Sequence, residues 1–467
     1  MYDIDAALDQ QILAVQKNRP AVIFTEATDP RIIEAACHLT RFVRPVFLAG
    51  EQEIKDVVHE ELGHLDPTRV EFTLSESAFC DPEQRTDLVE EFARACTELP
   101  EAMRRTDDFD AAVQLIREPA RFGIMAVRQG HADIVVGGIR HEPKDYFRPM
   151  SRLLAKQEVL CEAGVIVLPD SHPSDIFPHN IVVVGDVGFN ATMTPEVLAH
   201  VAVGTCAVAR DVIPESTLPI INGAIVSYSN KGSDEGPSPE LVRRATELVP
   251  DILADRIKRG RRYDTIRIEG EVKVSVALSR RSAQLYRRGQ EGAFVGGTNV
   301  IIVPNLDTGN LLFHLYATRY PEAKKFSVMF GIRFQGVDLP MDCNAEDAML
   351  GVKACVLRLH RFGHWHRTPK DTFFRRFRIL AVNPGSTSTK IAVYEGDQER
   401  FVEEIKHAEQ ELAPYEGKRI VEQYGMRKEL ILRALANHGL GVEDLDAVSS
   451  RGGLLQPIPH GTYDVND

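Results

Sequence analysis

Two polar segments follow apolar runs in the manner of phosphate-binding turns. The first apolar run, residues 298–304, ends at a proline and is followed by Asn305, Gly309 and Asn310. If the run is a strand of a parallel sheet, these residues lie at its carboxyl edge, beside the free N–H groups of the next helix. Side-chain amides, helix N–H groups and a glycine that lets a ligand approach all suit an anion. The segment therefore predicts Asn305, Gly309 and Asn310 as substrate-binding residues.

The second segment, residues 225–233, carries hydroxyl groups and one cation. Its apolar start is followed by Ser227, Ser229, Lys231 and Gly232. A Lys-Gly-Ser turn alone is more often a plain loop than a binding site. Two polar turns that leave one sheet favour binding, because hydroxyl donors and a cation then join the first set at the same edge. We therefore predict Ser227, Ser229, Lys231 and Gly232 as further substrate-binding residues.

The turns must be positioned by strands and helices. The sequence offers these as short apolar runs that alternate with helical patterns. Residues 21–24 and 45–48 are predicted strands, and between them Asp29 and Pro30 start a helix with its apolar residues on one face. Strands that are apolar throughout are typical of a parallel sheet that is covered on both faces. Further such runs lie at residues 134–136, 165–168, 181–184, 224–227 and 300–303. The pattern predicts an α/β fold built on parallel sheets.

The composition excludes several classes of function. The chain has 467 residues and a net charge of -13, which argues against nucleic acid and anionic membranes as partners. No N-terminal signal peptide is recognisable, and no apolar run reaches the ~18 residues of a membrane span. The seven cysteines form no C-x-x-C pair, so neither a disulfide framework nor a zinc site is indicated. We expect a cytoplasmic protein with small-molecule substrates.

The chain becomes locally basic from about residue 357. It includes His364 and His366, but two imidazoles two positions apart, without a third ligand, are a weak metal signal. We therefore interpret residues 363–377 as a basic linker between domains and predict no metal site.

Five segments in order resemble the phosphate acetyl/butyryltransferase family. They are residues 21–50, 130–138, 146–149, 225–233 and 298–310. The resemblance implies reversible transfer of an acyl group between coenzyme A and inorganic phosphate, with both as substrates and with no bound cofactor. It also implies a homodimer and a two-subdomain fold like that of isocitrate and isopropylmalate dehydrogenases. Subdomain I is then expected at residues 1–155 and 335–362, and subdomain II at residues 156–334.

The resemblance also implies catalytic residues. Asp347 matches an aspartate that would act as a base toward the thiol of coenzyme A, and Arg148 matches an arginine that contacts phosphate or coenzyme A. Arg104 matches a second family arginine, although Arg105 fits nearly as well.

One departure from the family affects catalysis directly. The family has Ser-Arg six or seven positions before the aspartate, whereas this chain has Pro340 and Met341. Loss of a donor to the oxyanion typically costs about 2.7 to 4 kcal/mol of barrier stabilisation. Arg333 or Gln335 could replace it. Two functions remain open on this basis: an active acyltransferase, or a non-catalytic module that binds acyl-CoA and regulates.

The last 90 or so residues resemble a different family. Residues 378–395 predict a strand, a hydroxyl-rich turn and a second strand, which differs from a Walker loop because no helix follows the lysine. This hairpin resembles the phosphate-binding hairpin of acetate and butyrate kinases, and residues 450–463 resemble butyrate kinase. The matched phosphate-site positions are Asn383, Ser386, Ser388, Lys390 and Arg451.

Residues 378–467 are therefore expected to be a truncated butyrate-kinase-like domain, an incomplete half of an actin-like ATPase fold. The family continues well past the position of Asp467, so we interpret the segment as a truncated or frameshifted part of a longer fusion. Mg-ATP would be needed only by a complete kinase domain. We expect strands at residues 379–382, 391–394 and 447–448 in one sheet, a helix near residues 418–438, and exposed strand edges.

Overall fold

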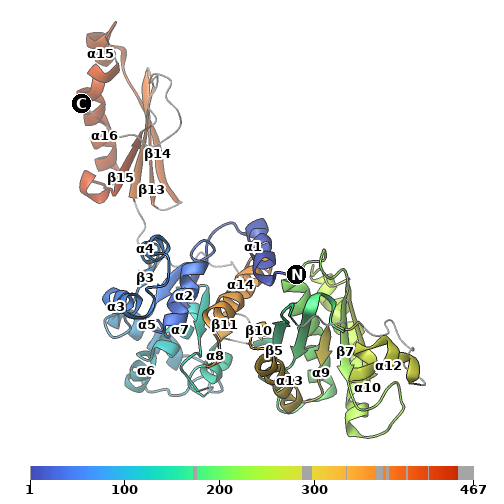
Figure 1. Cartoon of the computed structure of the whole chain (residues 1–467). Helices are drawn as coiled ribbons and strands as arrows, with labels where there is room; N and C mark the ends of the chain where they lie inside the picture. Colours follow the sequence, from blue (N-terminus) through green and yellow to red (C-terminus); the bar gives the residue numbers. More distant parts are fainter. Residues whose placement is uncertain are drawn as a thin grey trace. The chain divides into compact units, whose positions relative to one another are not determined.

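The computed structural model divides into two compact units, Met1–Phe373 and Phe374–Asp467 (Figure 1). It describes residues 2–142, 144–154, 156–171, 176–286, 297–332, 334–362, 372–374, 378–385, 387–395, 398–418 and 420–450. Most of the linker predicted at residues 363–377 lies outside these ranges.

The first sheet of the first unit is entirely parallel. Its strand order is β11-β4-β1-β2-β3. The strands are β1 (Ala21–Phe24), β2 (Arg44–Phe47), β3 (Ala78–Phe79), β4 (Ile134–Gly137) and β11 (Gln335–Asp338). Every residue of β1 and β4 is buried, as the continuous apolar runs predict. Strand β11 therefore returns to this sheet from a distant part of the chain.

Helices pack around this sheet. They are α1 (Ile4–Val15), α2 (Pro30–Leu39), α3 (Glu51–Glu61), α4 (Pro67–Ser75), α5 (Thr86–Thr97), α6 (Phe109–Ile116), α7 (Pro119–Arg128), α8 (Phe147–Leu153) and α14 (Ala345–Phe362). Figure 1 shows orange α14 among the blue elements of the N-terminal region. Helix α2 begins as predicted: Asp29 caps its N-terminus, Pro30 occupies the first turn, and the apolar face is buried.

The second sheet of this unit is mixed, and here the prediction of parallel sheets was wrong in part. Its order is β10-β5-β6-β9-β7-β8. The strands are β5 (Lys156–Val167), β6 (Ile181–Gly185), β7 (Ile221–Val226), β8 (Ile266–Val272), β9 (Val300–Ile302) and β10 (Lys324–Ile332). Strand β5 pairs antiparallel with both β6 and β10. Direct antiparallel pairing of these strands is set by long-range contacts, which a strand's own apolar pattern does not specify.

Five helices belong to the region of the second sheet: α9 (Pro195–Val212), α10 (Pro237–Lys258), α11 (Val274–Leu278), α12 (Arg280–Leu285) and α13 (Leu306–Arg319). Helix α9 is buried over most of its length and lies against the sheet. Helix α13 follows β9 directly, so the predicted turn around Asn305 does connect a parallel strand to a helix.

The second unit is one small sheet with one main helix. Its strands are β12 (Arg378–Pro384), β13 (Ser388–Glu395), β14 (Gln398–Lys406) and β15 (Ala447–Ser450), in the order β14-β13-β12-β15. The helices are α15 (Glu409–Leu412) and α16 (Tyr424–Asn437). The predicted strands and helix are confirmed in these positions. All four residues of β15 are exposed, so the sheet presents an uncovered edge strand.

Among the described residues, no helix is long and apolar enough to cross a membrane.

A buried lysine ties α1 to α14. The Lys353 side chain is 3% exposed, and its Nζ lies 2.5 Å from Asp5 Oδ1 and 2.6 Å from Asp9 Oδ1. Removing one partner of a buried ion pair leaves charge without compensation. We expect Lys353→Met to destabilise the first unit by about 3 kcal/mol, measured by urea unfolding. Lys55→Met is the control, because it removes an exposed pair with Glu51 and should cost about 1 kcal/mol or less. Equal effects of the two variants would contradict the assignment.

Candidate active site

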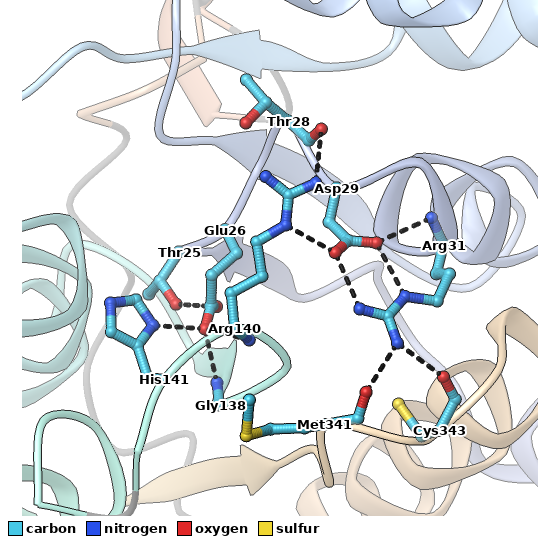
Figure 2. A network of polar contacts seen from close by, with 10 residues as sticks. All are labelled: Thr25, Glu26, Thr28, Asp29, Arg31, Gly138, Arg140, His141, Met341 and Cys343. Carbon is cyan, nitrogen blue, oxygen red and sulfur yellow. Dashed lines mark hydrogen bonds and ion pairs between the residues drawn. The ribbon is translucent and has the colours of Figure 1, made fainter. Parts of the chain in front are cut away.

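A network of polar side chains occupies the carboxyl edge of the first sheet (Figure 2). Glu26 follows β1 and is buried. Its Oε1 accepts hydrogen bonds from Gly138 N at 2.8 Å and His141 Nδ1 at 2.6 Å, and its Oε2 accepts one from Thr25 Oγ1 at 2.6 Å. Burial alone would raise the pKa of Glu26, but these bonds outweigh it and lower that pKa. The same contact raises the pKa of His141. An ionised Glu26 therefore joins the segments that follow β1 and β4.

Asp29 is the second carboxylate of this edge, and it binds two guanidinium groups. Arg31 donates from Nε to Oδ1 at 3.0 Å and from Nη2 to Oδ2 at 2.9 Å. Arg140 donates from Nε to Oδ2 at 2.7 Å. Burial would raise the pKa of Asp29, but the two arginines lower it. One carboxylate thus binds two guanidinium groups at the sheet edge.

Arg31 also holds the segment around Pro340 and Met341, where a departure from the resembling family is expected from the sequence. Its Nη1 donates to the carbonyl oxygens of Met341 at 2.8 Å and Cys343 at 3.0 Å. Figure 2 shows this bridge from α2 to residues 341–343. Neither Pro340 nor Met341 has a side-chain hydrogen-bond donor, and the Met341 side chain is 55% exposed. The loop is thus fixed at the carboxyl edge by its backbone.

Asp347, the predicted base, lies in the first turn of α14 and is buried. Its Oδ2 is 2.9 Å from Lys325 Nζ, and its Oδ1 accepts a hydrogen bond from Lys325 N at 3.1 Å. It lines a cavity of about 20 Å³ together with Ser327, Asp338 and Pro340. The structure therefore brings Asp347 to the loop at residue 340, but pairs its charge with a lysine.

Two further carboxyl groups in this region, those of Asp338 and Glu162, were missed by sequence reasoning. Asp338 ends β11, and desolvation together with the charges of Glu162 and Glu26 raises its pKa well above the usual range. Glu162 on β5 is buried, and burial raises its pKa to about 7, against a hydrogen bond from Ser327. Neither residue gave a usable signal, because Asp338 follows the mixed segment 335–337 and Glu162 lies within a strand.

Arg148 lies elsewhere, in a basic cavity of about 140 Å³. None of the described residues that line the cavity is acidic. Five of them are cationic: Arg105, Arg121, Lys144, Arg148 and Arg152. Arg148 and Arg152 are four residues apart on α8, which places them on one face of the helix. The cavity that Asp347 lines does not include Arg148 in its lining.

Of the two neighbouring arginines left open by the sequence, Arg105 lines this cavity and Arg104 does not. Arg104 Nη1 donates to Thr97 O at 3.4 Å, and its Nη2 is 3.9 Å from Asp107 Oδ2. The fold around residues 103–106 thus directs the second arginine of the pair toward Arg148.

The predicted hydroxyl-rich turn after β7 bonds to carboxylates of the chain itself. Ser229 Oγ donates to Glu271 Oε1, and Gly232 N donates to the same oxygen at 2.9 Å. Lys231 Nζ donates to Glu269 Oε2 at 3.2 Å. Ser227 Oγ accepts from Ser229 N at 3.3 Å. These groups therefore stabilise the turn in this conformation.

The turn before α13 is likewise engaged in capping and close packing. Asn305 caps the helix by accepting a hydrogen bond from Thr308 N at 2.9 Å. Asn310 Nδ2 donates to Val187 O at 3.4 Å. A Cβ added at Gly309 would lie 2.0 Å from Asp186 O, so only glycine permits this approach. Asn305 itself is exposed and remains accessible to a ligand.

In the second unit, the hairpin between β12 and β13 is held by groups that the sequence did not indicate. Arg427 on α16 donates to Gly385 O at 2.6 Å and Thr389 Oγ1 at 2.7 Å. Ser388 Oγ donates to Glu404 Oε1 at 3.0 Å. Asn383 and Lys390 are paired across the two strands, and both are exposed. Ser386 and Arg451 lie outside the described residues.

No group of three or more histidine, cysteine or acidic side chains that could hold a metal ion occurs in the described part of the chain. His364 and His366 lie outside it.

The Glu26–His141 pair makes a prediction about stability and pH. The raised pKa of His141 contributes stability in full below its unfolded value of 6.5, and that stability is lost as pH rises through the folded pKa. The lowered pKa of Glu26 contributes above 4.5 and is lost as pH falls through the folded pKa. We expect His141→Gln to reduce the fall in unfolding free energy between about pH 6 and about pH 9, measured with urea. His59→Gln, on an exposed face of α3, is the control; identical profiles for both variants would contradict the pairing.

Comparison with known proteins shows the family and the fold of the chain. Residues 7–350 match the sequence model of the family described as Phosphate acetyl/butaryl transferase. A phosphotransacetylase from Streptococcus pyogenes has a similar fold, with 20% identity, a TM-score of 0.60, and coverage of 76% of this chain and 99% of that chain. The EutD phosphotransacetylase from Staphylococcus aureus gives 20% identity and a TM-score of 0.60, covering 77% of this chain and 100% of that one. Because the family match spans most of the chain, the protein belongs to the phosphate acetyl/butyryl transferase family and is an acyltransferase enzyme.

Proposed function

We propose that the first unit transfers an acyl group reversibly between coenzyme A and inorganic phosphate, with the Arg105–Arg148 cavity binding phosphate groups of coenzyme A. The observation that carries this proposal is the cavity itself. It gathers five cationic side chains, with no acidic residue in its described lining, in a chain of net charge -13. An anionic substrate is attracted to such a local cluster, and guanidinium groups bind phosphate oxygens in a bidentate manner.

The chemistry that this arrangement must support is thiol attack on an acyl phosphate. The sulfur of coenzyme A forms a bond to the carbonyl carbon, the bond from that carbon to the phosphate oxygen breaks, and phosphate leaves. The thiol has a pKa near ~8.5, so a base that accepts its proton helps at neutral pH. We assign this role to Asp347, which requires Lys325 to move from its present contact at 2.9 Å.

The remaining predicted residues have different roles in this proposal. Asn305 is exposed at the start of α13, where free helix N–H groups favour an anion, and Gly309 and Asn310 keep that helix start in place. The groups at Ser227, Ser229, Lys231 and Gly232 would contact substrate only after release from Glu271 and Glu269. We further propose a cytoplasmic homodimer, as the family resemblance implies.

A non-catalytic module that binds acyl-CoA is the second candidate. Two observations favour it: the loop at Pro340 and Met341 offers no side-chain donor, and Asp347 is paired with Lys325. Calorimetry with acyl-CoA, combined with an assay of thioester formation from acyl phosphate and coenzyme A, separates the two candidates. Binding without turnover for acyl groups of two to five carbons would establish the module.

The basic cavity predicts which arginine substitutions raise the KM for coenzyme A. Arg148→Ala and Arg105→Ala should each raise the KM for coenzyme A by roughly 10- to 150-fold, the value of a lost charge-assisted hydrogen bond. Arg104→Ala should change it by less than about threefold, because Arg104 bonds to Thr97 outside the cavity. Steady-state kinetics with the three variants checks this. A larger effect at Arg104 than at Arg105 would reverse the assignment.

For the second unit we propose a butyrate-kinase-like segment that does not make ATP in this chain. Residues 378–395 form the strand, turn and strand of the resembling hairpin. The Ser388 hydroxyl donates to Glu404, and Arg427 donates to the hairpin, so neither is free for a phosphoryl group. Phosphoryl transfer depends almost wholly on positioned charge.

We therefore expect no ATP when the protein is incubated with butyryl phosphate, ADP and magnesium. A luciferase assay measures the product, with a complete acetate kinase and acetyl phosphate as the positive control. ATP formation that Arg451→Ala abolishes would show that this segment is catalytic.

A further inference from the structure

The loops after β4 and β11 meet at one edge of the first sheet. The two strands pair in parallel, with Gly137 opposite Asp338, and Leu339 N donates to Gly137 O at 2.8 Å. Gly138 has a φ of +102°, and a Cβ at this position would lie 2.5 Å from Asp338 Oδ1. The segment that carries Arg140 is therefore in direct contact with the start of the loop that carries Pro340 and Met341.

Of the two arginines that bind Asp29, Arg140 has the guanidinium group with N–H donors left for a ligand. Its Nε donates to Asp29 Oδ2 at 2.7 Å and its Nη2 to Thr28 O at 3.3 Å, while the side chain is 49% exposed. No described residue accepts a hydrogen bond from its Nη1. Arg31, by contrast, bonds to both oxygens of Asp29 and to two backbone carbonyls.

Arg140 shares its carboxylate partner with another cation. Asp29 is the ion-pair partner of both Arg140 and Arg31, and Glu26 pairs with His141. Burial and the charges of Glu162 and Glu26 raise the pKa of Asp338, the next carboxyl group, well above its usual range. Substrates of open α/β sheets bind outside the carboxyl ends of the strands, where Arg140 lies.

We propose that Arg140 binds the phosphate that attacks the thioester, and the phosphoryl group of the acyl phosphate in reverse, supplying the positive charge that Met341 lacks. The inference rests on the proposed function, since it assigns a substrate to this edge. Phosphate would approach Nη1 and Nη2 while Asp29 keeps Nε in place. Arg140 acts by touching substrate, whereas Arg31 positions the neighbouring loop.

Arg140 could instead serve only as a surface ion-pair partner of Asp29. Such pairs contribute little to stability and would affect no single substrate. The two roles therefore differ in the kinetic constant that changes: a phosphate-binding residue changes the KM for phosphate, whereas a merely structural one changes kcat or the melting temperature.

The test measures acyl-CoA plus phosphate turnover in the full chain. Arg140→Gln should raise the KM for phosphate by roughly 10- to 150-fold and leave the KM for acyl-CoA unchanged. Arg140→Lys should be intermediate, because lysine keeps the charge but loses the fork. Adding Met341→Arg to Arg140→Gln should lower the KM for phosphate again. Arg259→Gln is the matched control: Arg259 is exposed and its Nη2 is 2.8 Å from one carboxylate, Asp255.

An unchanged KM for phosphate in Arg140→Gln, with a lower melting temperature or kcat, overturns the proposal. If the wild type shows no turnover, the proposed function fails separately, and phosphate binding decides the role of Arg140. In that case inorganic phosphate should raise the melting temperature of the wild type and of Arg259→Gln by more than that of Arg140→Gln, which keeps only the basic cavity around Arg148. Equal stabilisation of all three proteins would overturn the assignment.

Discussion

The carboxylate of Asp29 is the contact on which the arrangement of the sheet edge depends. It caps α2 by accepting a hydrogen bond from Arg31 N at 3.0 Å, and it also binds the guanidinium groups of Arg31 and Arg140. Arg31 also donates to the carbonyls of Met341 and Cys343. The side chains of Asp29 and Arg31 together therefore link the segments that follow β1, β4 and β11 (Figure 2). A carboxylate that is 3% exposed is costly unless it is paired, and several charge-assisted hydrogen bonds offset that cost.

Hydrogen bonds and neighbouring charges shift the pKa values of two carboxyl groups at the same edge in opposite directions. The pKa of Glu26 is lowered, against its burial, because His141, Thr25 and Gly138 donate to it. Burial and the charges of Glu162 and Glu26 raise the pKa of Asp338 instead. One edge thus holds an ionised carboxylate that organises the loops and a second carboxyl group whose neutral form is favoured.

Polar residues of the right type are not necessarily available to a ligand. Ser229 and Ser388 both lie in turns predicted from the sequence to bind phosphate, yet each donates its hydroxyl to a carboxylate, Glu271 and Glu404. A hydroxyl needs only one good acceptor, and a nearby carboxylate of the chain is always present at higher effective concentration than a free anion. The Arg148 cavity differs, because none of its described lining residues is acidic, although Arg121 of its lining is paired with Glu118.

The sequence by itself determined the local elements and the family. Uniformly apolar runs such as β1 and β4 predict buried parallel strands, and Asp29 with Pro30 predicts a helix start, because both signals act within a few residues. Only the tertiary structure decided that β5 pairs antiparallel, that Arg105 rather than Arg104 lines the cavity with Arg148, and that Arg140 bonds to Asp29. These outcomes depend on which strands become neighbours and in what register. The periodicity of a segment fixes which of its faces is buried, but it does not specify the residues that this face will contact.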